Sequence, residues 1–469
     1  MERSKPYMKR ILKAVVLTAV IAALLTVSAF ASDYDHCADA LHDLGLFSGT
    51  DAGYELDRAP NRAETAVMLV RMLGQEQNAR QLTYSAPFTD VPQWAQPYVQ
   101  YLYDNGLASG TSANIFGSGE LCTAQQYTAF LLRALGYSDK AGGDFTYMNA
   151  LEFGQRIGLV DMFNCDTDNF LRDNVVAMSY TALATAPKSG EADLLTKLVN
   201  TGAVKDAKGY DKLFQTFRDY GKALSESNSS TTIAMIADVK ANIQSSGINM
   251  MDMNMKMDLS MKIDQNNIDK SKMAIIMDME GRYSDELVNA GFVDPSQASE
   301  KTRMAVYFTD GYAYVNSDGQ KVKTAASAKD FYDEYMTAAA AAEEKNYPIC
   351  VYRELTATTS GNTTTYHAVL ADGPYNSLFV QLLDMAEQQE GAPSDASMTC
   401  DDIILDATVR NGAAVRSKLA MVMHVTEDGE TMDVAMDMDI HDFKFGSAVN
   451  VALPGDLNTY LDVTGLYEE

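Results

Sequence analysis

Three stretches within the first 190 residues end in the same way, and this internal repeat restricts the folds open to the chain. Each stretch ends in Gly-Leu, at 45–46, 106–107 and 158–159. Counting back eight, seven and four residues from each glycine gives Cys37, Ala38 and Leu41, then Tyr98, Val99 and Leu102, then Ala150, Leu151 and Gly154. Residues at this spacing share one face of a helix, and a glycine after the last turn is typical of a helix C-cap. The sequence therefore predicts three short helices that end alike.

A second helix is predicted after each of these, at Ala63–Leu73, Ala124–Leu135 and about Asn174–Ala184. Two of these begin with a capping box, because Asn61 precedes Glu64 by three residues and Thr123 precedes Gln126 by three. The unit is thus a helix, a loop and a helix, present at about 33–76, 88–138 and 145–187. Self-similarity of this kind indicates a repeat architecture.

The N-terminus has the features of a secretory signal. Basic residues come first, an apolar run follows from Ala14 to Phe30, and Ala29-Phe-Ala31 forms a cleavage site. We expect residues 1–31 to be removed and Ser32 to be the mature N-terminus. An uncleaved anchor is the alternative, because the apolar run approaches the ~18 residues that span a membrane. The chain is therefore predicted to be secreted and to act at the cell surface.

The second repeat carries the motif that identifies the first region. Its residues run Phe88-Thr-Asp-Val-Pro-Gln-Trp-Ala-Gln-Pro-Tyr-Val-Gln-Tyr-Leu-Tyr-Asp-Asn-Gly-Leu-Ala-Ser-Gly110. This stretch resembles the opening of the S-layer homology domain, and Asn61-Arg-Ala-Glu64 resembles that family's T-R-A-E motif. The resemblance implies an all-α bundle in which three repeats form a pseudo-trimer. It also implies that residues 32–187 attach the protein to a pyruvylated secondary cell wall polysaccharide.

The resemblance nominates site residues as well. Arg62 and Arg172 stand where the family has its anion-binding arginine, whereas the second repeat has Ala124 there. Gly49 and Gly110 lie in the loops whose backbone groups would assist. We therefore expect one or two working grooves, and the alternative is that both arginines are solvated residues of a first helical turn. Trp94 is either a sugar platform or an anchor in the helical core, and the core role is favoured.

A different periodicity begins after a polar linker at 188–209, which holds one short helix near 193–201. Helices are predicted at 211–224 and 231–244. From Met251 to Ile263 apolar residues, mostly Met, then alternate with polar ones, which predicts a strand with one buried face. Runs at 419–425 and 434–440 alternate in the same way around Asp428-Gly429, a strong hairpin signal. With further helices at about 325–345 and 375–389, residues 210–469 are predicted to form an α+β domain with a curved antiparallel sheet packed on helices.

The hairpin Asp310-Gly-Tyr-Ala-Tyr-Val-Asn-Ser-Asp-Gly-Gln320 resembles one found in LolA-like half-barrel domains of exported proteins. This resemblance implies a concave apolar face that could hold a lipid or another apolar ligand. The alternating methionines also suit copper(I), but a strand that faces the core already requires apolar residues there. Likewise Asp433, Asp437, Asp439 and His441 could hold a divalent cation with His424, although a solvated polar face is the favoured interpretation. No metal and no cofactor are therefore expected.

The formal net charge of −27 argues against binding to nucleic acid or to anionic lipid, since both would repel the chain. Five cysteines are too few and too scattered for a disulfide framework. A Cys350–Cys400 bridge is conceivable, but buried thiols are favoured. We find no G-x-S-x-G, H-E-x-x-H, Walker or C-x-x-C motif, and no histidine spaced to serve a nucleophile, so a non-catalytic protein is expected.

Two functions remain open. The chain is either a surface protein that binds wall polysaccharide and presents a ligand-binding or partner-binding half-barrel, or a structural S-layer component whose distal domain is a spacer.

Overall fold

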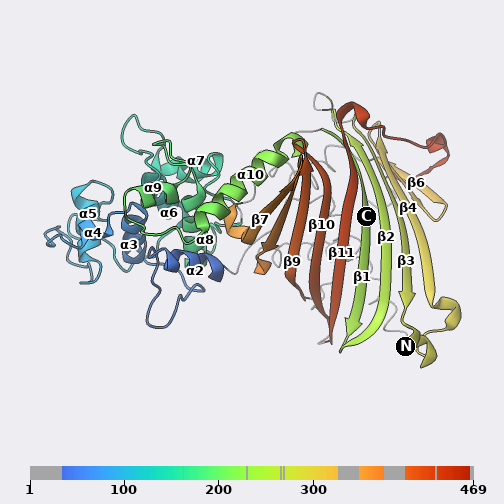
Figure 1. Ribbon diagram of the computed structural model, residues 1–469, viewed down its shortest axis with the longest axis horizontal. Coiled ribbons are helices and arrows are strands. Elements are labelled where there is room, and N and C mark those ends of the chain that lie inside the picture. The colour runs from blue at the N-terminus through green and yellow to red at the C-terminus, as the bar shows by residue number, and fades with distance from the viewer. Residues whose placement is uncertain are drawn as a thin grey trace. The chain divides into compact units, whose positions relative to one another are not determined.

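The computed structural model describes residues 34–161, 163–228, 231–264, 267, 270–325, 348–373, 397–427 and 430–464. The chain divides into two compact units. The helical unit comprises the described residues up to Phe217 together with Pro348–Arg353, and the sheet unit comprises those from Arg218 onward without that segment (Figure 1). The predicted signal segment and its cleavage site before Ser32 lie outside the described residues. Within the described part of the chain, no helix is long and apolar enough to cross a membrane.

The helical unit contains the predicted pairs of helices. The first helices of the three repeats are α2 (Asp35–Asp43), α5 (Gln96–Asp104) and α7 (Ala150–Arg156). The second helices are α3 (Arg62–Met72), α6 (Ala124–Ala134) and α8 (Arg172–Ala184). Two shorter helices, α4 (Glu76–Ala79) and α9 (Leu194–Asn200), accompany them. Both predicted capping boxes are present, at Asn61 with Glu64 and at Thr123 with Gln126.

The predicted glycine caps end the three first helices. Gly45, Gly106 and Gly158 have φ of 74°, 60° and 74°, the left-handed region that favours glycine. The leucine after each glycine donates its N–H to a carbonyl five residues back, and the three N···O distances are 2.8, 2.9 and 2.9 Å. This is the hydrogen bond of a Schellman cap, so the repeated Gly-Leu has a structural cause.

The helices of neighbouring repeats pack in a regular order. Helix α3 of the first repeat packs against α5 of the second, and α6 of the second packs against α7 of the third. Helix α8 of the third repeat packs against α2 of the first. Each second helix therefore pairs with a first helix from another repeat, and α6 also contacts both α3 and α8.

A segment from far along the chain completes the core of the helical unit. Residues Ile349–Val351 form a 3-10 turn that packs against α8, and each is at most 1% exposed. Helix α9, within the predicted linker, also packs on α8 through buried Leu194, Leu195 and Leu198. No sequence pattern assigns 348–353 to this unit, because the contact joins residues more than 150 positions apart.

In the described residues, the sheet unit is built on one open sheet of twelve strands (Figure 1). The first six strands are β1 (Thr232–Ser245), β2 (Ile248–Lys262), β3 (Lys272–Tyr283), β4 (Ser299–Thr309), β5 (Tyr312–Ser317) and β6 (Gln320–Ala325). The others are β7 (Tyr352–Ser360), β8 (Thr363–Leu370), β9 (Ser397–Arg410), β10 (Ala413–Glu427), β11 (Glu430–Phe445) and β12 (Leu461–Asp462).

The order across the sheet is β12-β6-β5-β4-β3-β2-β1-β11-β10-β9-β8-β7. Strands β1 and β11 therefore meet in the middle and pair antiparallel. Helix α10 (Tyr210–Asn228) contains the boundary between the two units, which lies between Phe217 and Arg218, and α11 (Asp285–Asn289) belongs to the sheet unit. The coarse prediction of helices followed by a large antiparallel sheet is thus confirmed.

One segment that was predicted to be a helix is a strand of the sheet. Residues 231–244 were expected to form a helix but form β1, where Ala237, Val239, Ala241 and Ile243 are buried and the residues between them face outward. The small alanines of this segment are compatible with the periodicity of a helix and with that of a strand. Because the segment pairs with β2 and β11, it forms a strand. The helices expected at 325–345 and 375–389 lie almost wholly outside the described residues, as does the Asp428-Gly429 turn.

The methionine face of β2 is buried, as the alternation predicts. Met253, Met255 and Met257 are 1%, 2% and 0% exposed, and the residues between them are exposed. Packing in the core therefore accounts for these thioethers without copper. All five cysteines are buried free thiols, and the conceivable Cys350–Cys400 bridge is not formed.

Candidate functional site

The aspartate of the Phe88-Thr-Asp-Val motif fixes a loop of the second repeat. Its carboxylate accepts hydrogen bonds from the backbone N–H groups of Phe116, Gly117 and Ser118 at 2.7, 2.8 and 2.8 Å. Partial burial raises the pKa of Asp90, but these three N–H groups outweigh it and hold the pKa below its ordinary value. Asp90 therefore holds the loop that carries Phe116.

Arg62 lies against this loop. The residue begins α3 in the first repeat, and its guanidinium carbon lies 4.9 Å from the ring centroid of Phe116 in the second repeat. Its Nη2 donates to the backbone oxygen of Ser109 at 2.7 Å. Arg62 thus lies at the junction of the first two repeats, stacked on an aromatic ring and held by one hydrogen bond.

The guanidinium of Arg62 retains capacity for a ligand. No described carboxylate lies within ion-pair distance of it, and its Nη1 has no hydrogen-bond partner among the described residues. Its Nε also lacks a partner but is buried, so a ligand would approach the Nη groups. The backbone N–H groups nearby are already used, because Arg62 N donates to Glu120 O and Ala63 N donates to Ser118 O. The side chain, and not the helix N-terminus, is therefore the group that can receive an anion.

Arg172 has the same place in the third repeat but different surroundings. Its side chain is 6% exposed, its Nη1 lies 3.0 Å from Oε1 of Glu64, and its Nε donates to Tyr54 O at 3.0 Å. The guanidinium carbon lies 5.3 Å from the Phe47 ring centroid. Desolvation lowers the pKa of Arg172 against the opposing effect of Glu64. Its contacts are thus internal to the protein.

The two loop glycines have a steric role. A Cβ on Gly110 would lie 2.3 Å from the backbone oxygen of Ile115 and 2.5 Å from the Phe88 ring. A Cβ on Gly49, whose φ is 64°, would lie 2.8 Å from the backbone oxygen of Gly53. Both positions therefore require glycine for the loop to close beside the arginines.

This arrangement agrees with the comparison to known families. Residues 87–123 match the S-layer homology domain. The matched segment contains Asp90, Ser109, Gly110 and Phe116, which together form the side of the junction that faces Arg62. The prediction of S-layer homology is confirmed for this repeat.

Relatives over part of the chain are surface proteins. A cell surface protein of Thermoanaerobacter kivui is 30% identical over 149 residues, which cover 31% of this chain and 19% of that protein. A middle cell wall protein of Brevibacillus brevis is 30% identical over 125 residues, covering 26% of this chain and 12% of that protein. An endoglucanase of a Bacillus species is 31% identical over 108 residues, covering 20% and 12%. This chain thus spans less than a fifth of the length of each relative, and the first two support the predicted location at the cell wall.

Two solved structures also resemble this chain. A beta-barrel-like protein of unknown function from Brucella abortus is 8% identical, covers 46% of this chain and 99% of its own, and gives a TM-score of 0.16. A LolA superfamily protein from Nitrosomonas europaea is 6% identical, covers 50% and 96%, and gives a TM-score of 0.16. Neither likeness bears on function.

The second repeat departs from the first at the position of the arginine. Where the first repeat has Arg62, the second has Ala124, followed by Gln125, whose Nε2 donates to the backbone oxygen of Tyr147 in the third repeat. This junction therefore has no guanidinium at the start of its helix. Trp94 is 54% exposed, so the favoured interpretation of Trp94 as a core anchor is wrong. Its alternative role as a sugar platform stays a prediction.

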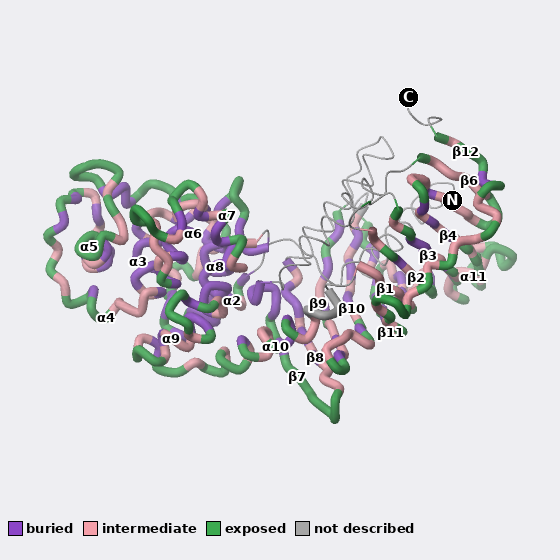
Figure 2. The backbone as a smooth tube through the Cα atoms, turned by 90° about the horizontal axis from the view of Figure 1, so that it is seen from above, coloured by how far each residue is buried: buried purple, intermediate pink, exposed green. Residues whose placement is uncertain are grey.

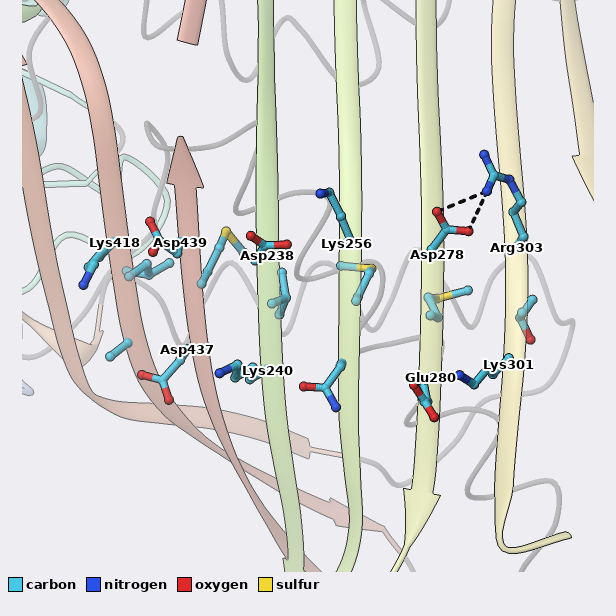
Figure 3. Close-up of a pocket in the computed structure, with 18 of the residues that line it drawn as sticks. Asp238, Lys240, Lys256, Asp278, Glu280, Lys301, Arg303, Lys418, Asp437 and Asp439 are labelled. Atoms are coloured by element: carbon cyan, nitrogen blue, oxygen red, sulfur yellow. Dashed lines mark hydrogen bonds and ion pairs between the residues drawn. The ribbon is translucent and has the colours of Figure 1, made fainter. Parts of the chain in front are cut away.

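The sheet unit offers a second, polar site. Its solvent face is hollowed into a cavity of about 950 Å³ lined mainly by charged side chains, and Figure 3 shows these from β10 across to β4. One row of cross-strand neighbours runs Arg303, Asp278, Lys256, Asp238, Asp439, Lys418, Asp406 and His367. Signs alternate along this row except where Asp238 meets Asp439. Cross-strand neighbours of opposite charge stabilise each other, so the row is largely self-neutralising.

Two of the carboxylates considered for a cation, Asp433 and Asp439, pair with basic groups instead. Asp439 binds the guanidinium of Arg416, and its Oδ1 lies 2.7 Å from Arg416 Nε. His424 is held between Asp433 at 2.7 Å and Asp401 at 3.1 Å, and His441 Nε2 lies 2.9 Å from Asp238. Among the described residues, no three His, Cys, Asp or Glu side chains are grouped to hold a metal ion.

Proposed function

We propose that this is a non-catalytic protein that attaches to the bacterial cell wall through Arg62. One observation carries the proposal: at the junction of two S-layer homology repeats, a guanidinium is stacked on Phe116 and bound to Ser109 O, yet has no described carboxylate partner. A guanidinium without a counter-charge favours an external anion through charge-assisted hydrogen bonds, and this local attraction acts against the general repulsion from a chain of net charge −27.

We infer that the anion is a carboxylate carried by a wall polysaccharide, such as a pyruvyl group. A guanidinium has a planar fork of donors that matches a carboxylate, and Nη1 of Arg62, which has no hydrogen-bond partner among the described residues, is the donor we assign to the ligand, because Nε is buried. Arg172 already has Glu64 as its counter-charge, so the proposal assigns the ligand to Arg62 alone. We also propose that the three repeats form a pseudo-trimer. The helix contacts support this, because the first repeat packs against the second, the second against the third and the third against the first.

For the sheet unit we propose a structural role and not a lipid carrier. The apolar face that was expected to hold a lipid is buried, with Met253, Met255 and Met257 at most 2% exposed. An apolar ligand would have to displace the atoms that bury this face. Mass spectrometry of an organic extract of the purified full chain tests this, and a stoichiometric lipid would overturn the structural role.

The wall proposal is tested by pelleting the full-length mature chain with purified cell walls. We expect Arg62→Ala to weaken binding about tenfold, since a charge-assisted hydrogen bond is lost. Arg80→Ala is the matched control, because Arg80 lies in the same unit, is exposed and already has Glu76 as its counter-charge at 2.8 Å. Both variants remove one positive charge, so a general electrostatic effect would weaken both equally.

Two outcomes decide the proposal. If Arg62→Ala pellets as well as the unaltered chain, Arg62 is not the anion site. Walls treated with mild acid to remove pyruvyl groups should retain less of the unaltered chain and should no longer distinguish it from Arg62→Ala. If that treatment changes nothing while Arg62→Ala still binds weakly, the anion is a different acidic group of the wall.

A further inference from the structure

The two edges of the sheet differ in whether another segment of the chain covers them. At one edge, β6 is covered by the C-terminal segment: β12 pairs with it, Val463 N donates to Lys323 O at 2.9 Å, and Ala325 N donates to Thr464 Oγ1 at 2.8 Å. Lys323 on this edge also pairs with Asp462 at 3.4 Å. Covering strands and edge lysines are common means of preventing a sheet from pairing with another chain.

The other edge, β7, has neither protection. Its residues from Thr356 to Ser360 are all exposed, and most of β7 is coloured as exposed in Figure 2. Among the described residues, this stretch is hydrogen-bonded to β8, with Thr359 Oγ1 3.0 Å from Thr364 Oγ1, and to no other element. One row of its backbone N–H and C=O groups therefore points away from the sheet.

The exposed part of this edge, from Thr356 to Ser360, is free of charge. Residues 355–365 contain no ionisable side chain, in a chain of which 22% of residues are charged. They also contain no proline or lysine, and threonine, which favours strands, is the commonest residue. In a protein this acidic, an uncharged edge is a place where a second acidic chain can approach without opposing carboxylates.

Local structure holds β7 extended and ready to pair. The strand is anchored at its start by buried Tyr352 and Leu355, which are 2% and 4% exposed. It turns into β8 through the two residues Gly361 and Asn362, and Gly361 has φ of 62°. Glycine at the first position of a two-residue turn gives a tight hairpin that matches the twist of the strands.

We infer that β7 pairs antiparallel with β7 of a second copy of this chain, which joins two sheets into one. A two-fold axis at Ala357 places Thr356 opposite Thr358 and Leu355 opposite Thr359. Glu354, the nearest carboxylate, then faces Ser360 and not its own copy. The edge is thus self-complementary, as an isologous interface requires, and it forms cross-strand threonine pairs. This inference does not depend on Arg62, which lies in the helical unit.

The contact is weak in isolation, because one strand pair buries little surface, and its Kd is roughly micromolar or higher. Salt strengthens it, since screening reduces the repulsion between two chains of net charge −27. Sedimentation velocity of the full mature chain at roughly 1 to 100 µM, in about 0.05 M and 0.5 M NaCl, measures both effects.

Charge placed on the edge tests the assignment. Ala357→Lys sets two ammonium groups opposite each other, so the dimer should be lost even though the net negative charge of the chain falls. Ala435→Lys is the matched control, because Ala435 is an exposed alanine on the central strand β11 and the change of charge is identical. Ala357→Glu should also be monomeric, and an equimolar mixture of Ala357→Lys with Ala357→Glu should restore the dimer.

Each result supports or overturns the inference. A chain that stays monomeric across this range at high salt overturns it, as does a dimer that Ala357→Lys leaves intact. A dimer lost equally in Ala435→Lys assigns the interface to the polar face and also overturns it. Circular dichroism of each variant shows whether the sheet is retained, and restoration by the mixed charges excludes misfolding as the cause.

Discussion

Glu64 Oε1 lies 3.0 Å from Nη1 of Arg172, and this ion pair joins the first repeat to the third. The same carboxylate accepts from Arg58 Nη2 at 2.6 Å and from the backbone N–H of Asn61 at 2.9 Å. Arg62 is the corresponding residue of the first repeat, and it has no described carboxylate partner. One sequence position therefore has a structural role in one repeat and is available for a ligand in another.

The first prediction concerns this ion pair. Glu64→Gln should lower the free energy of unfolding of the helical unit by on the order of 3 kcal/mol, because Arg172 remains buried without a counter-charge. Denaturant titration of the full chain, followed through the helical unit by hydrogen exchange, measures the loss. Glu55→Gln is the control: Glu55 also pairs with Arg58 but is more exposed, so this variant should lower the free energy of unfolding much less than Glu64→Gln does. Equal losses would contradict the central role of Glu64.

The stability of the helical unit should fall in acid. The pKa values of Glu64 and Asp90 are lowered: burial opposes the shift in both, but arginine and backbone donors to Glu64, and backbone N–H groups to Asp90, outweigh it. A depressed carboxyl pKa contributes stability that is present above the unfolded pKa, about 4, and is lost as pH falls through the folded pKa. Melting curves between about pH 7 and pH 3 should show this loss. Asp90→Asn should make the melting temperature depend less steeply on pH. An unchanged pH dependence in this variant would exclude Asp90 as a contributor.

Local signals predicted the pairs of helices, including the capping box with which α3 begins at Arg62. Capping boxes and C-cap glycines act within a few residues, so the sequence alone reveals them, as it reveals the alternation of β2. Contacts between distant residues could not be predicted in this way. The burial of Arg172 depends on Glu64 and Tyr54, and the exposure of Trp94 depends on which helices pack around it.

In the sheet, too, local patterns could be predicted from the sequence and contacts between distant residues could not. The alternation of polar and apolar residues on β2 and β11 predicted a polar face for each strand, but the row from Arg303 to His367 depends on the register of eight strands. The register between two strands depends on both of them, so it cannot be predicted from the sequence of either strand alone. For the same reason β1 was taken for a helix, since its alanines are compatible with both periods.

A glycine substitution tests the loop beside Arg62. Gly110→Ala should destabilise the second repeat and displace the Ser109 carbonyl, because the new Cβ would lie 2.3 Å from Ile115 O. We expect weaker wall pelleting together with a lower melting temperature. Gly119→Ala is the matched control, since nothing lies within 4 Å of its Cβ position. If both variants behave alike, the close approach at Gly110 is not what fixes the loop.

Two histidines of the polar face should titrate above the ordinary pKa of histidine. Hydrogen bonds to Asp433 and then Asp401 raise the pKa of His424, and one to Asp238 raises that of His441. A raised histidine pKa adds stability that is present below the unfolded pKa and is lost as pH rises through the folded value. NMR titration of the ring protons should show both shifts, and Asp433→Asn should lower the pKa of His424 while leaving His441 unchanged. A His424 pKa that does not move in Asp433→Asn would exclude that pair.

The last prediction concerns the dependence of the helical unit on residues 348–353. Ile349 is 1% exposed and its turn packs against α8, so Ile349→Ala leaves a cavity and should cost roughly 2 to 4 kcal/mol. Hydrogen exchange of the α8 amides should accelerate accordingly, although Ile349 is distant in sequence. Ile404→Ala is the matched control, because Ile404 lies on β9 and is 37% exposed, so α8 should keep its protection. Unchanged exchange of α8 in Ile349→Ala would mean that the helical unit is complete without this segment. Faster exchange would mean that a fragment ending at Phe217 lacks part of its own core, so that wall binding has to be measured on the full chain.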